Sequence, residues 1–173
     1  MKKKYSLLLL VFLVSCQEIE PRQPINQKEV SNISGSAKRN KNLFAQEERL
    51  LNAAAKEDSS HIYKRATSGY LFAYVNKSPD YFKSPQKGEL VSFEYSIETL
   101  QKELLYNKKE LGIVNYRIDQ EDLLPALREG LRIMKANEVV VFLFPSYLCY
   151  GYQGDGHKIG INQPLRFTIE RLY

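Results

Sequence analysis

One short amphipathic helix stands among segments that have the residue patterns of β-strands. Residues 123–134 place apolar side chains at positions 124, 127, 131 and 134, which lie on one face of an α-helix. Pro125 falls at the start of this segment, where proline is favoured as the first helical residue. The continuous apolar run 139–144 follows, and the alternating run 165–172 closes the chain. This order predicts an α+β fold, in which an antiparallel sheet holds one helix on its concave face.

Further strands are predicted before the helix. Residues 90–95 alternate apolar and polar side chains, as in a half-buried strand. Residues 100–106 and 114–118 are shorter candidates for strands. Together with the two runs after the helix, these segments supply the sheet.

An extension with a helix and a hairpin is predicted ahead of these strands. Apolar residues seven positions apart predict an amphipathic helix from about residue 38 to residue 57. Residues 62–65 and 70–75 flank a turn that contains glycine, which is typical of a β-hairpin. An anionic surface would repel the acidic pair at 47–48 on the polar side of the helix. We therefore expect the helix to pack on its own domain or on a partner rather than on lipid.

The N-terminus has the features of an export signal. Three lysines at residues 2–4 precede an apolar run at residues 7–14, whereas a helix that spans a bilayer needs about 20 apolar residues. The run ends in Leu-Val-Ser-Cys, which resembles a bacterial lipobox. Residues 1–15 are therefore predicted to be a lipoprotein signal peptide, and Cys16 to be the lipidated residue that anchors the protein to a membrane. An ordinary signal peptide followed by an incidental cysteine is the alternative.

The rest of the chain is predicted to divide into three parts. Residues 16–42 are polar, and we expect the lipidated cysteine to be followed there by a flexible tether. Residues 43–87 form the helix and hairpin extension, and residues 88–173 form the main domain. Cleavage of the signal lowers the net charge from +5 to +2, because 25 basic residues become 22 against 20 acidic ones. The basic excess thus belongs largely to the signal, and no nucleic-acid partner is expected.

The remaining cysteine and the histidines carry no predicted chemistry. Cys149 is expected to be a small apolar side chain in the core rather than a reactive thiol. His61 and His157 have no cysteine or acidic residues near them at metal-ligand spacing. We therefore expect no metal site.

Several stretches of the main domain follow one another in the order of a known protein family. The first strand carries Gly88 and the sequence Val-Ser-Phe-Glu-Tyr at 91–95, and the helix carries an apolar pair, Glu-Gly and Met134. Residues 144–151 (Phe-Pro-Ser-Tyr-Leu-Cys-Tyr-Gly) are similar to the Ile-Pro-Pro-x-Leu-Ala-Tyr-Gly segment of that family. In these stretches, residues 88–173 resemble the FKBP-type peptidyl-prolyl isomerases.

The resemblance implies a sheet wrapped around the short helix, with an aromatic and aliphatic pocket between them that binds proline-containing peptides. Four residues are implied in catalysis, with the backbone N–H of Leu124 and the hydroxyl of Tyr150 holding substrate carbonyls: Tyr95, Leu124, Tyr150 and Phe167. Five more would line the substrate site: Leu105, Val114, Leu123, Leu127 and Ile159. No cofactor is implied, because rotation about an X-Pro bond needs neither a nucleophile nor a proton transfer.

Combined with the lipobox, the resemblance implies a membrane-anchored isomerase that faces the periplasm from the inner or outer membrane. It would assist the folding of exported proteins. The whole chain also resembles the FKBP-type lipoproteins that are associated with gliding motility in Bacteroidetes.

Three positions depart from the family's pattern. The usual Phe-Asp pair aligns with Leu105 and Tyr106, so this strand lacks the carboxylate. Val114 and Leu127 stand where aromatic side chains are usual. These departures favour an alternative function, a catalytically weak or inactive peptide-binding or chaperone-like module. A third hypothesis is a structural lipoprotein that scaffolds a membrane complex through the helix at residues 43–58.

Overall fold

The computed structural model describes residues 28–79 and 81–173. The chain divides at Lys38 into two units, and the candidate site lies in residues 39–173. The elements follow in the order α2 (Lys28–Glu57), β1 (Lys64–Arg65), β2 (Leu71–Asn76), β3 (Leu90–Glu98), β4 (Leu104–Tyr106), α3 (Lys108–Leu111), β5 (Val114–Arg117), α4 (Pro125–Ile133), β6 (Val139–Phe144), the 3-10 helix η2 (Ser146–Leu148) and β7 (Leu165–Arg171).

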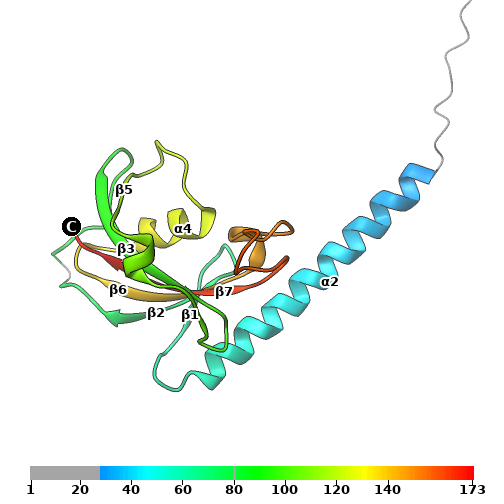
Figure 1. Cartoon of the computed structure of the whole chain (residues 1–173), viewed down its shortest axis with the longest axis horizontal. Coiled ribbons are helices and arrows are strands. Elements are labelled where there is room, and N and C mark those ends of the chain that lie inside the picture. The colour runs from blue at the N-terminus through cyan, green and yellow to red at the C-terminus, as the bar shows by residue number, and fades with distance from the viewer. Residues whose placement is uncertain (1–27, 80) are drawn as a thin grey trace, which may run out of the picture. The chain divides into compact units, whose positions relative to one another are not determined.

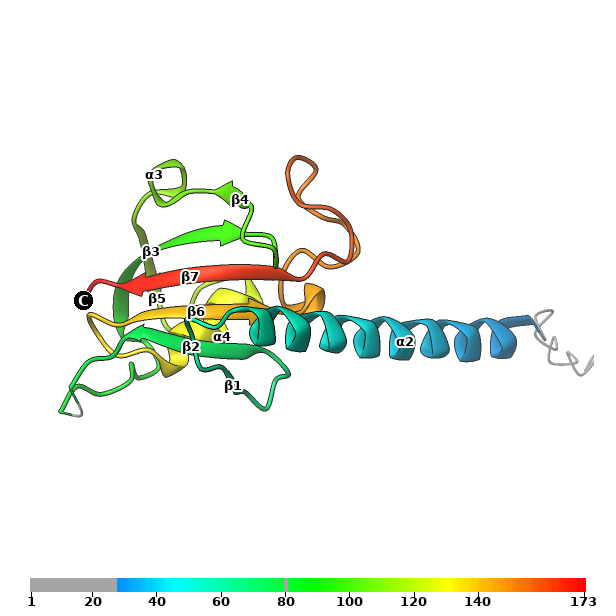
Figure 2. The ribbon, with the colours of Figure 1, turned by 90° about the horizontal axis from the view of Figure 1, so that it is seen from below.

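The strands form one antiparallel sheet in the order β1-β2-β6-β7-β3-β4 (Figure 2). β5 pairs with the first half of β3, on the edge where β4 pairs with the last residues of β3. Residues directly opposite in antiparallel strands share a face of the sheet. The register places Tyr95 opposite Ile169, and it places both Ile97 and Phe142 opposite Phe167.

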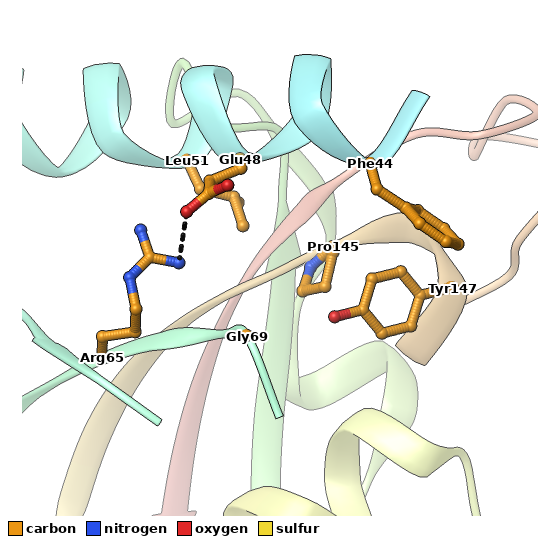
Figure 3. A pocket seen from close by; sticks show the side chains of 7 residues that line it. All are labelled: Phe44, Glu48, Leu51, Arg65, Gly69, Pro145 and Tyr147. Atoms are coloured by element: carbon orange, nitrogen blue, oxygen red, sulfur yellow. Dashed lines mark ion pairs between the residues drawn. The ribbon is translucent and has the colours of Figure 1, made fainter. Parts of the chain in front are cut away.

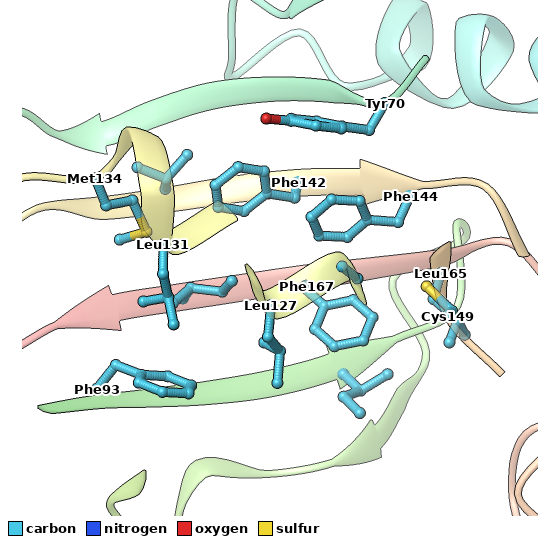
Figure 4. Packing of buried hydrophobic residues seen from close by; sticks show 14 of the residues in the cluster. Tyr70, Phe93, Leu127, Leu131, Met134, Phe142, Phe144, Cys149, Leu165 and Phe167 are labelled. Atoms are coloured by element: carbon cyan, nitrogen blue, oxygen red, sulfur yellow. The ribbon is translucent and has the colours of Figure 1, made fainter. Parts of the chain in front are cut away.

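The short helix α4 lies against one face of the curved sheet, as predicted (Figure 1). Leu127 and Leu131 are buried against Phe93, Phe142 and Phe167 of the sheet, as Figure 4 shows. The predicted helical face is thus confirmed as the face that packs on the sheet.

Gly130 allows α4 to approach the sheet closely. A Cβ atom at this position would lie 3.1 Å from Cδ1 of Ile169 and 3.2 Å from Cζ of Phe142. Gly130 of the Glu-Gly pair therefore has a packing role, because a Cβ atom there would require Ile169 or Phe142 to shift by a few tenths of an ångström.

The second half of α2 covers the opposite face of the sheet. Leu51 packs with Leu71 and Leu143, which are direct partners in the register of β2 and β6. Their neighbours Phe72 and Phe142 belong to the core on the α4 side, so Leu71 and Leu143 point away from α4. The expectation that this helix packs on its own domain is confirmed for residues 39–57.

α2 ends at Glu57, as predicted, but it begins at Lys28 rather than at about residue 38. The prediction of a flexible tether up to residue 42 is therefore wrong for residues 28–42. The physical reason is helix cooperativity: once the turns around Leu51 are packed, each added residue contributes one backbone hydrogen bond without a new nucleation cost. The predicted signal peptide, Cys16 and the tether up to residue 27 lie outside the described residues. In the part of the chain that is described, no helix is both long enough and apolar enough to cross a membrane.

A buried charge cluster follows the C-terminus of α2. Asp58 accepts hydrogen bonds from Arg166 at 2.9 Å and from the Tyr63 hydroxyl at 2.8 Å, and Lys102 and His61 also contact it. Burial opposes ionisation of Asp58, but these hydrogen bonds outweigh it and hold the pKa of the carboxyl well below its ordinary value. The cluster joins the end of α2 to β7.

Most predicted strands are confirmed, but the strand predicted at residues 62–65 is only Lys64–Arg65, and the one predicted at residues 100–106 is also shorter. The hairpin is present as β1 and β2. Of residues 100–106, only Leu104–Tyr106 forms a strand. The residues before it form a turn, in which Lys102 has a φ of +69° and its N–H bonds to the carbonyl of Thr99 at 3.0 Å.

Candidate functional site

The nine residues implied for the pocket lie in or against a single apolar cluster on the α4 side of the sheet. Leu127, Ile159 and Phe167 are buried members of this cluster. The other six are partly buried and pack against it: Tyr95, Leu105, Val114, Leu123, Leu124 and Tyr150. These residues come from four strands, the start of α4 and two loop positions, so tertiary folding brings them together.

Two parallel aromatic rings form one wall of the site. The rings of Tyr95 and Phe167 have centroids 6.1 Å apart and planes within 7° of each other. Phe144 contacts Phe167 edge-on, with centroids 5.5 Å apart. Phe167 is fully buried and Tyr95 only partly. Phe167 therefore supports the wall from within the core, and Tyr95 is the more exposed of the two rings.

Tyr150 lies just after η2 and keeps its proton at neutral pH. Burial raises the pKa of its phenol to about 12, with smaller contributions from nearby Tyr95, Cys149 and Asp155. Burial also raises the pKa of Tyr95. Both hydroxyls are thus neutral hydrogen-bond donors, which is the form that would hold a substrate carbonyl.

A carboxylate reaches the site from a loop rather than from a strand. The hydroxyl of Tyr106 on β4 donates a short hydrogen bond to Oδ2 of Asp155. Burial opposes ionisation of Asp155, but the bonds from Tyr106 and from the backbone N–H groups of Ile159 and His157 lower its pKa to about 2. Tyr106, which stands where the family has its acidic residue, therefore contacts an acidic residue 49 positions away.

The loop from residue 151 to residue 164 is held in one conformation by bonds within it. Oδ1 of Asp155 accepts the N–H groups of His157 and Ile159, each at 2.8 Å. Gly154 has a φ of +67°, and a Cβ atom there would lie 2.4 Å from the carbonyl oxygen of Ile159. The loop thereby fixes Ile159 in the core.

Leu124 precedes the first turn of α4 in an extended conformation, with φ −50° and ψ 129°. Its carbonyl accepts the first helical hydrogen bond, from Arg128 N–H at 3.1 Å. Its own N–H precedes the helical ladder, so it needs an acceptor from outside the helix. This N–H also lies at the positive end of the helix dipole, which favours a carbonyl or another electron-rich oxygen.

Glu47 of α2 contacts the segment that carries Tyr150, and the sequence did not point to it. This carboxylate is only 2% exposed, and it accepts the N–H of Ser146 at 2.8 Å and the Ser146 hydroxyl at 2.5 Å. Ser146 begins η2, and Tyr150 follows four residues later. A glutamate on a helix that also carries Leu51 gives no sequence signal of a partner 99 residues away.

Cys149 is a buried free thiol, and burial raises its pKa above the ordinary value. A protonated thiol that is only 9% exposed is a poor nucleophile. Within the described ranges, no three or more His, Cys, Asp or Glu side chains are grouped so that they could hold a metal ion. What the arrangement offers is an apolar, aromatic surface with neutral hydrogen-bond donors, which suits binding and twisting of a peptide bond.

Comparisons with known proteins identify the family. The family model described as FKBP-type peptidyl-prolyl cis-trans isomerase matches residues 82–172. A curated relative, the probable FKBP-type peptidyl-prolyl cis-trans isomerase FkpA of Neisseria meningitidis serogroup B, is 29% identical over 119 residues. That match covers 68% of this chain but only 43% of the relative, so this chain spans less than half of the relative's length.

Solved structures share the fold. The crystal structure of FkpA from Escherichia coli matches with a TM-score of 0.60 at 17% identity, covering 100% of this chain and 81% of that one. A peptidyl-prolyl cis-trans isomerase from Pseudomonas syringae pv. tomato also matches at a TM-score of 0.60 and 17% identity, covering 77% of this chain and 93% of that one. The structural likeness thus agrees with the family match, which extends over more than half of the chain. On this evidence the chain belongs to the FKBP-type peptidyl-prolyl cis-trans isomerase family.

Proposed function

We propose that this protein is an active peptidyl-prolyl cis-trans isomerase whose site is the cluster around Tyr95, Leu124, Tyr150 and Phe167. The barrier to rotation about a peptide bond is about 18–20 kcal/mol and comes from amide resonance. An apolar site disfavours the charge-separated resonance form, and donors placed for a twisted amide stabilise the transition state over the planar ground state. No covalent step is needed.

One observation carries this proposal: the neutral hydroxyl of Tyr150 and the N–H of Leu124 border the same apolar cluster. The phenol is protonated at neutral pH, as an ordinary tyrosine is, and burial raises its pKa further, to about 12. The N-cap position gives the Leu124 N–H no acceptor within its own helix. Two donors around an aromatic wall are what a peptide carbonyl next to proline requires.

In the Tyr106–Asp155 pair, the carboxylate of this site comes from the loop that carries Asp155 rather than from β4. Its ionised carboxylate accepts three hydrogen bonds from protein groups, so it acts in positioning the loop and not as an acid or a base. This supports an organised pocket in spite of the missing acidic residue on β4. The aliphatic side chains of Val114 and Leu127 would leave the pocket wider than an aromatic lining would.

The test is a prolyl isomerisation assay on the mature chain, with tetrapeptides that differ in the residue before proline. Acceleration is expected, and Tyr150→Phe lowers kcat/KM about tenfold, which corresponds to ~1.4 kcal/mol of transition-state stabilisation. Tyr173→Phe is the matched control, because Tyr173 is 74% exposed at the end of the chain. No acceleration by micromolar protein would refute the proposal.

We propose further that Cys16 is lipidated and anchors the protein to the inner or outer membrane, with the domain in the periplasm. The order of lysines, apolar run, Ser15 and Cys16 supports this. Acyl chains add about 0.8 kcal/mol per buried CH₂, so multiple acylation anchors a protein stably without a spanning helix. Incorporation of labelled fatty acid that is lost in Cys16→Ser tests the proposal. Equal labelling of both forms contradicts it.

The client proteins would be exported proteins, including those of the gliding motility apparatus. This part rests on the likeness of the whole chain to gliding-associated lipoproteins. Deletion of the gene should impair gliding, and Tyr150→Phe should reproduce part of the defect.

A scaffold role through α2 is the second candidate, because Phe44 and Leu50 of this helix are 48% and 41% exposed. Full motility with Tyr150→Phe but none with substitutions at these two residues would favour the scaffold.

A further inference from the structure

A groove of about 390 Å³ runs between α2 and the segment that carries Tyr150. One wall comes from α2 and the other from the residues around η2 and the loop that follows. The lining residues are Asn40, Leu43, Phe44, Ser146, Tyr147, Cys149, Tyr150, Gly151, Tyr152, Gln153 and Asn162. Tyr150 therefore belongs both to this groove and to the site described above, and the two meet at its side chain.

The groove presents aromatic surface to solvent. Phe44 is 48% exposed and Tyr147 is 46% exposed, and their rings meet edge-on with centroids 5.2 Å apart. Figure 3 shows this pair, with Phe44 reaching from α2 toward Tyr147. Tyr152 on the other wall is 76% exposed. Exposed aromatic side chains around a concave surface are typical of binding sites rather than of ordinary protein surface.

The polar part of the groove suits a peptide backbone. No charged side chain is among the described residues that line it, and its amides are Asn40, Gln153 and Asn162. An amide side chain both donates and accepts hydrogen bonds, as the backbone of an extended peptide does. By contrast, the adjacent cavity of about 310 Å³, which shares Phe44 and Tyr147, contains the ion pair of Arg65 with Glu48 at 3.3 Å (Figure 3).

We propose that the groove binds the part of the client chain that flanks the prolyl bond, and that it selects uncharged segments with apolar or aromatic side chains. This inference rests on the proposed function, because it places the prolyl bond at Tyr150. Because Tyr150 lines the groove and an extended chain advances about 3.3 Å per residue, side chains that flank a prolyl bond held at Tyr150 reach the groove. The helix α2 is thereby part of the substrate site, and client selectivity depends on it.

The experiment compares two eight-residue peptides with the same central Xaa-Pro. One carries Leu and Phe at the flanking positions, and the other carries Asp and Ser. Flanks on the N-terminal and the C-terminal side of proline are varied separately. The lipidated chain in nanodiscs is used, catalysis is followed by NMR exchange, and binding is followed by anisotropy of labelled peptide.

When the varied residues are on the side of proline that faces the groove, the apolar peptide is expected to bind and react about tenfold better than the acidic one. Phe44→Ala and Tyr152→Ala should each reduce this preference about fivefold, because each removes aromatic contact area from one wall. Gln46→Ala is the matched control, since Gln46 is an exposed residue of α2 outside the groove. It should leave the preference unchanged.

The outcomes separate this inference from the proposed function. Catalysis of both peptides with no preference, or a preference that survives both substitutions, overturns the groove and leaves the isomerase intact. Selective binding of the apolar peptide without any catalysis supports the groove and refutes the isomerase. A preference that Gln46→Ala abolishes as well would also overturn the groove, because it would indicate a general effect of the helix.

Discussion

Glu47 offers the sharpest test of how α2 and the candidate site depend on each other. Its carboxylate is 2% exposed, and both of its oxygens accept hydrogen bonds from Ser146, from the N–H at 2.8 Å and from the hydroxyl at 2.5 Å. Replacement by alanine leaves two buried donors of Ser146 without acceptors.

The magnitude follows from these two bonds. A buried group left without its partner costs about 1–3 kcal/mol, so the loss of both acceptors in Glu47→Ala should lower the free energy of unfolding by about 2–6 kcal/mol. Glu47→Gln should cost less than about 1 kcal/mol, because its carbonyl accepts the N–H of Ser146 and its amide donates to the Ser146 oxygen. Glutamine also removes the cost of burying a charge.

The assay is urea unfolding of the unchanged protein, Glu47→Ala and Glu47→Gln. The kcat and KM of each are then measured under conditions in which it is fully folded. Because Ser146 begins η2 and Tyr150 follows it, Glu47→Ala should also lower kcat more than it raises KM, and Glu47→Gln should restore kcat. Glu48→Ala is the control, since its side chain is 58% exposed and its pair with Arg65 contributes at most about 1 kcal/mol. Equal losses for Glu47→Ala and Glu48→Ala, or for Glu47→Ala and Glu47→Gln, would refute the reasoning.

Two other substitutions and one thiol-labelling experiment have definite expected outcomes. Asp58→Asn should lower the free energy of unfolding by about 3 kcal/mol, because it leaves the buried guanidinium of Arg166 with less compensation. The pKa of Asp58 lies below its ordinary value of 3.8, so its stabilisation is present above that pH and is lost as the pH falls below it. Urea titrations between pH 6 and pH 3 should therefore show a shallower acid loss for Asp58→Asn, and identical slopes would contradict this. Gly154→Ala should cost about 1–3 kcal/mol and shift the NMR signals of Ile159, because a Cβ atom would lie 2.4 Å from its carbonyl oxygen at a φ of +67°; an unshifted Ile159 would count against it. Cys149 should react with a thiol reagent about 100-fold more slowly in buffer than in urea, because its thiol is buried, and comparable rates would show an accessible thiol.

Much of the fold can be predicted from short stretches of the sequence. The helical face of residues 124–134 and the alternation of residues 90–95 depend on the periodicity of neighbouring side chains alone. The first turn of α4 at Pro125 likewise follows from local backbone chemistry. These elements are therefore confirmed close to where the sequence predicts them.

The ends of α2 and β4 were harder to predict from the sequence. The helix is ten residues longer at its N-terminus than the apolar pattern indicates, since it begins at Lys28 instead of about residue 38. β4 is shorter than predicted because Lys102 adopts a positive φ. A lysine gives no sequence signal of this backbone conformation. In both cases the ends depend on cooperativity and on turn geometry rather than on periodicity.

For the site, residue patterns and the family resemblance pointed to the apolar lining, and the structure brings all nine of those residues to one cluster. The polar partners were not predicted. Each forms a hydrogen bond with a residue far away in the sequence. The pairs are Tyr106 with Asp155, 49 residues apart, Ser146 with Glu47, 99 apart, and Arg166 with Asp58, 108 apart.

The sequence by itself thus determined the α+β class, the helix and its buried face, and the identity of the aromatic and aliphatic residues available for a pocket. Only the tertiary structure decided which carboxylate reaches Tyr106, that α2 contacts the segment of Tyr150, and that a groove opens between them. The physical reason is that periodicity and turn chemistry act between near neighbours, whereas a hydrogen bond between distant residues depends on strand register and on the path of every loop between them.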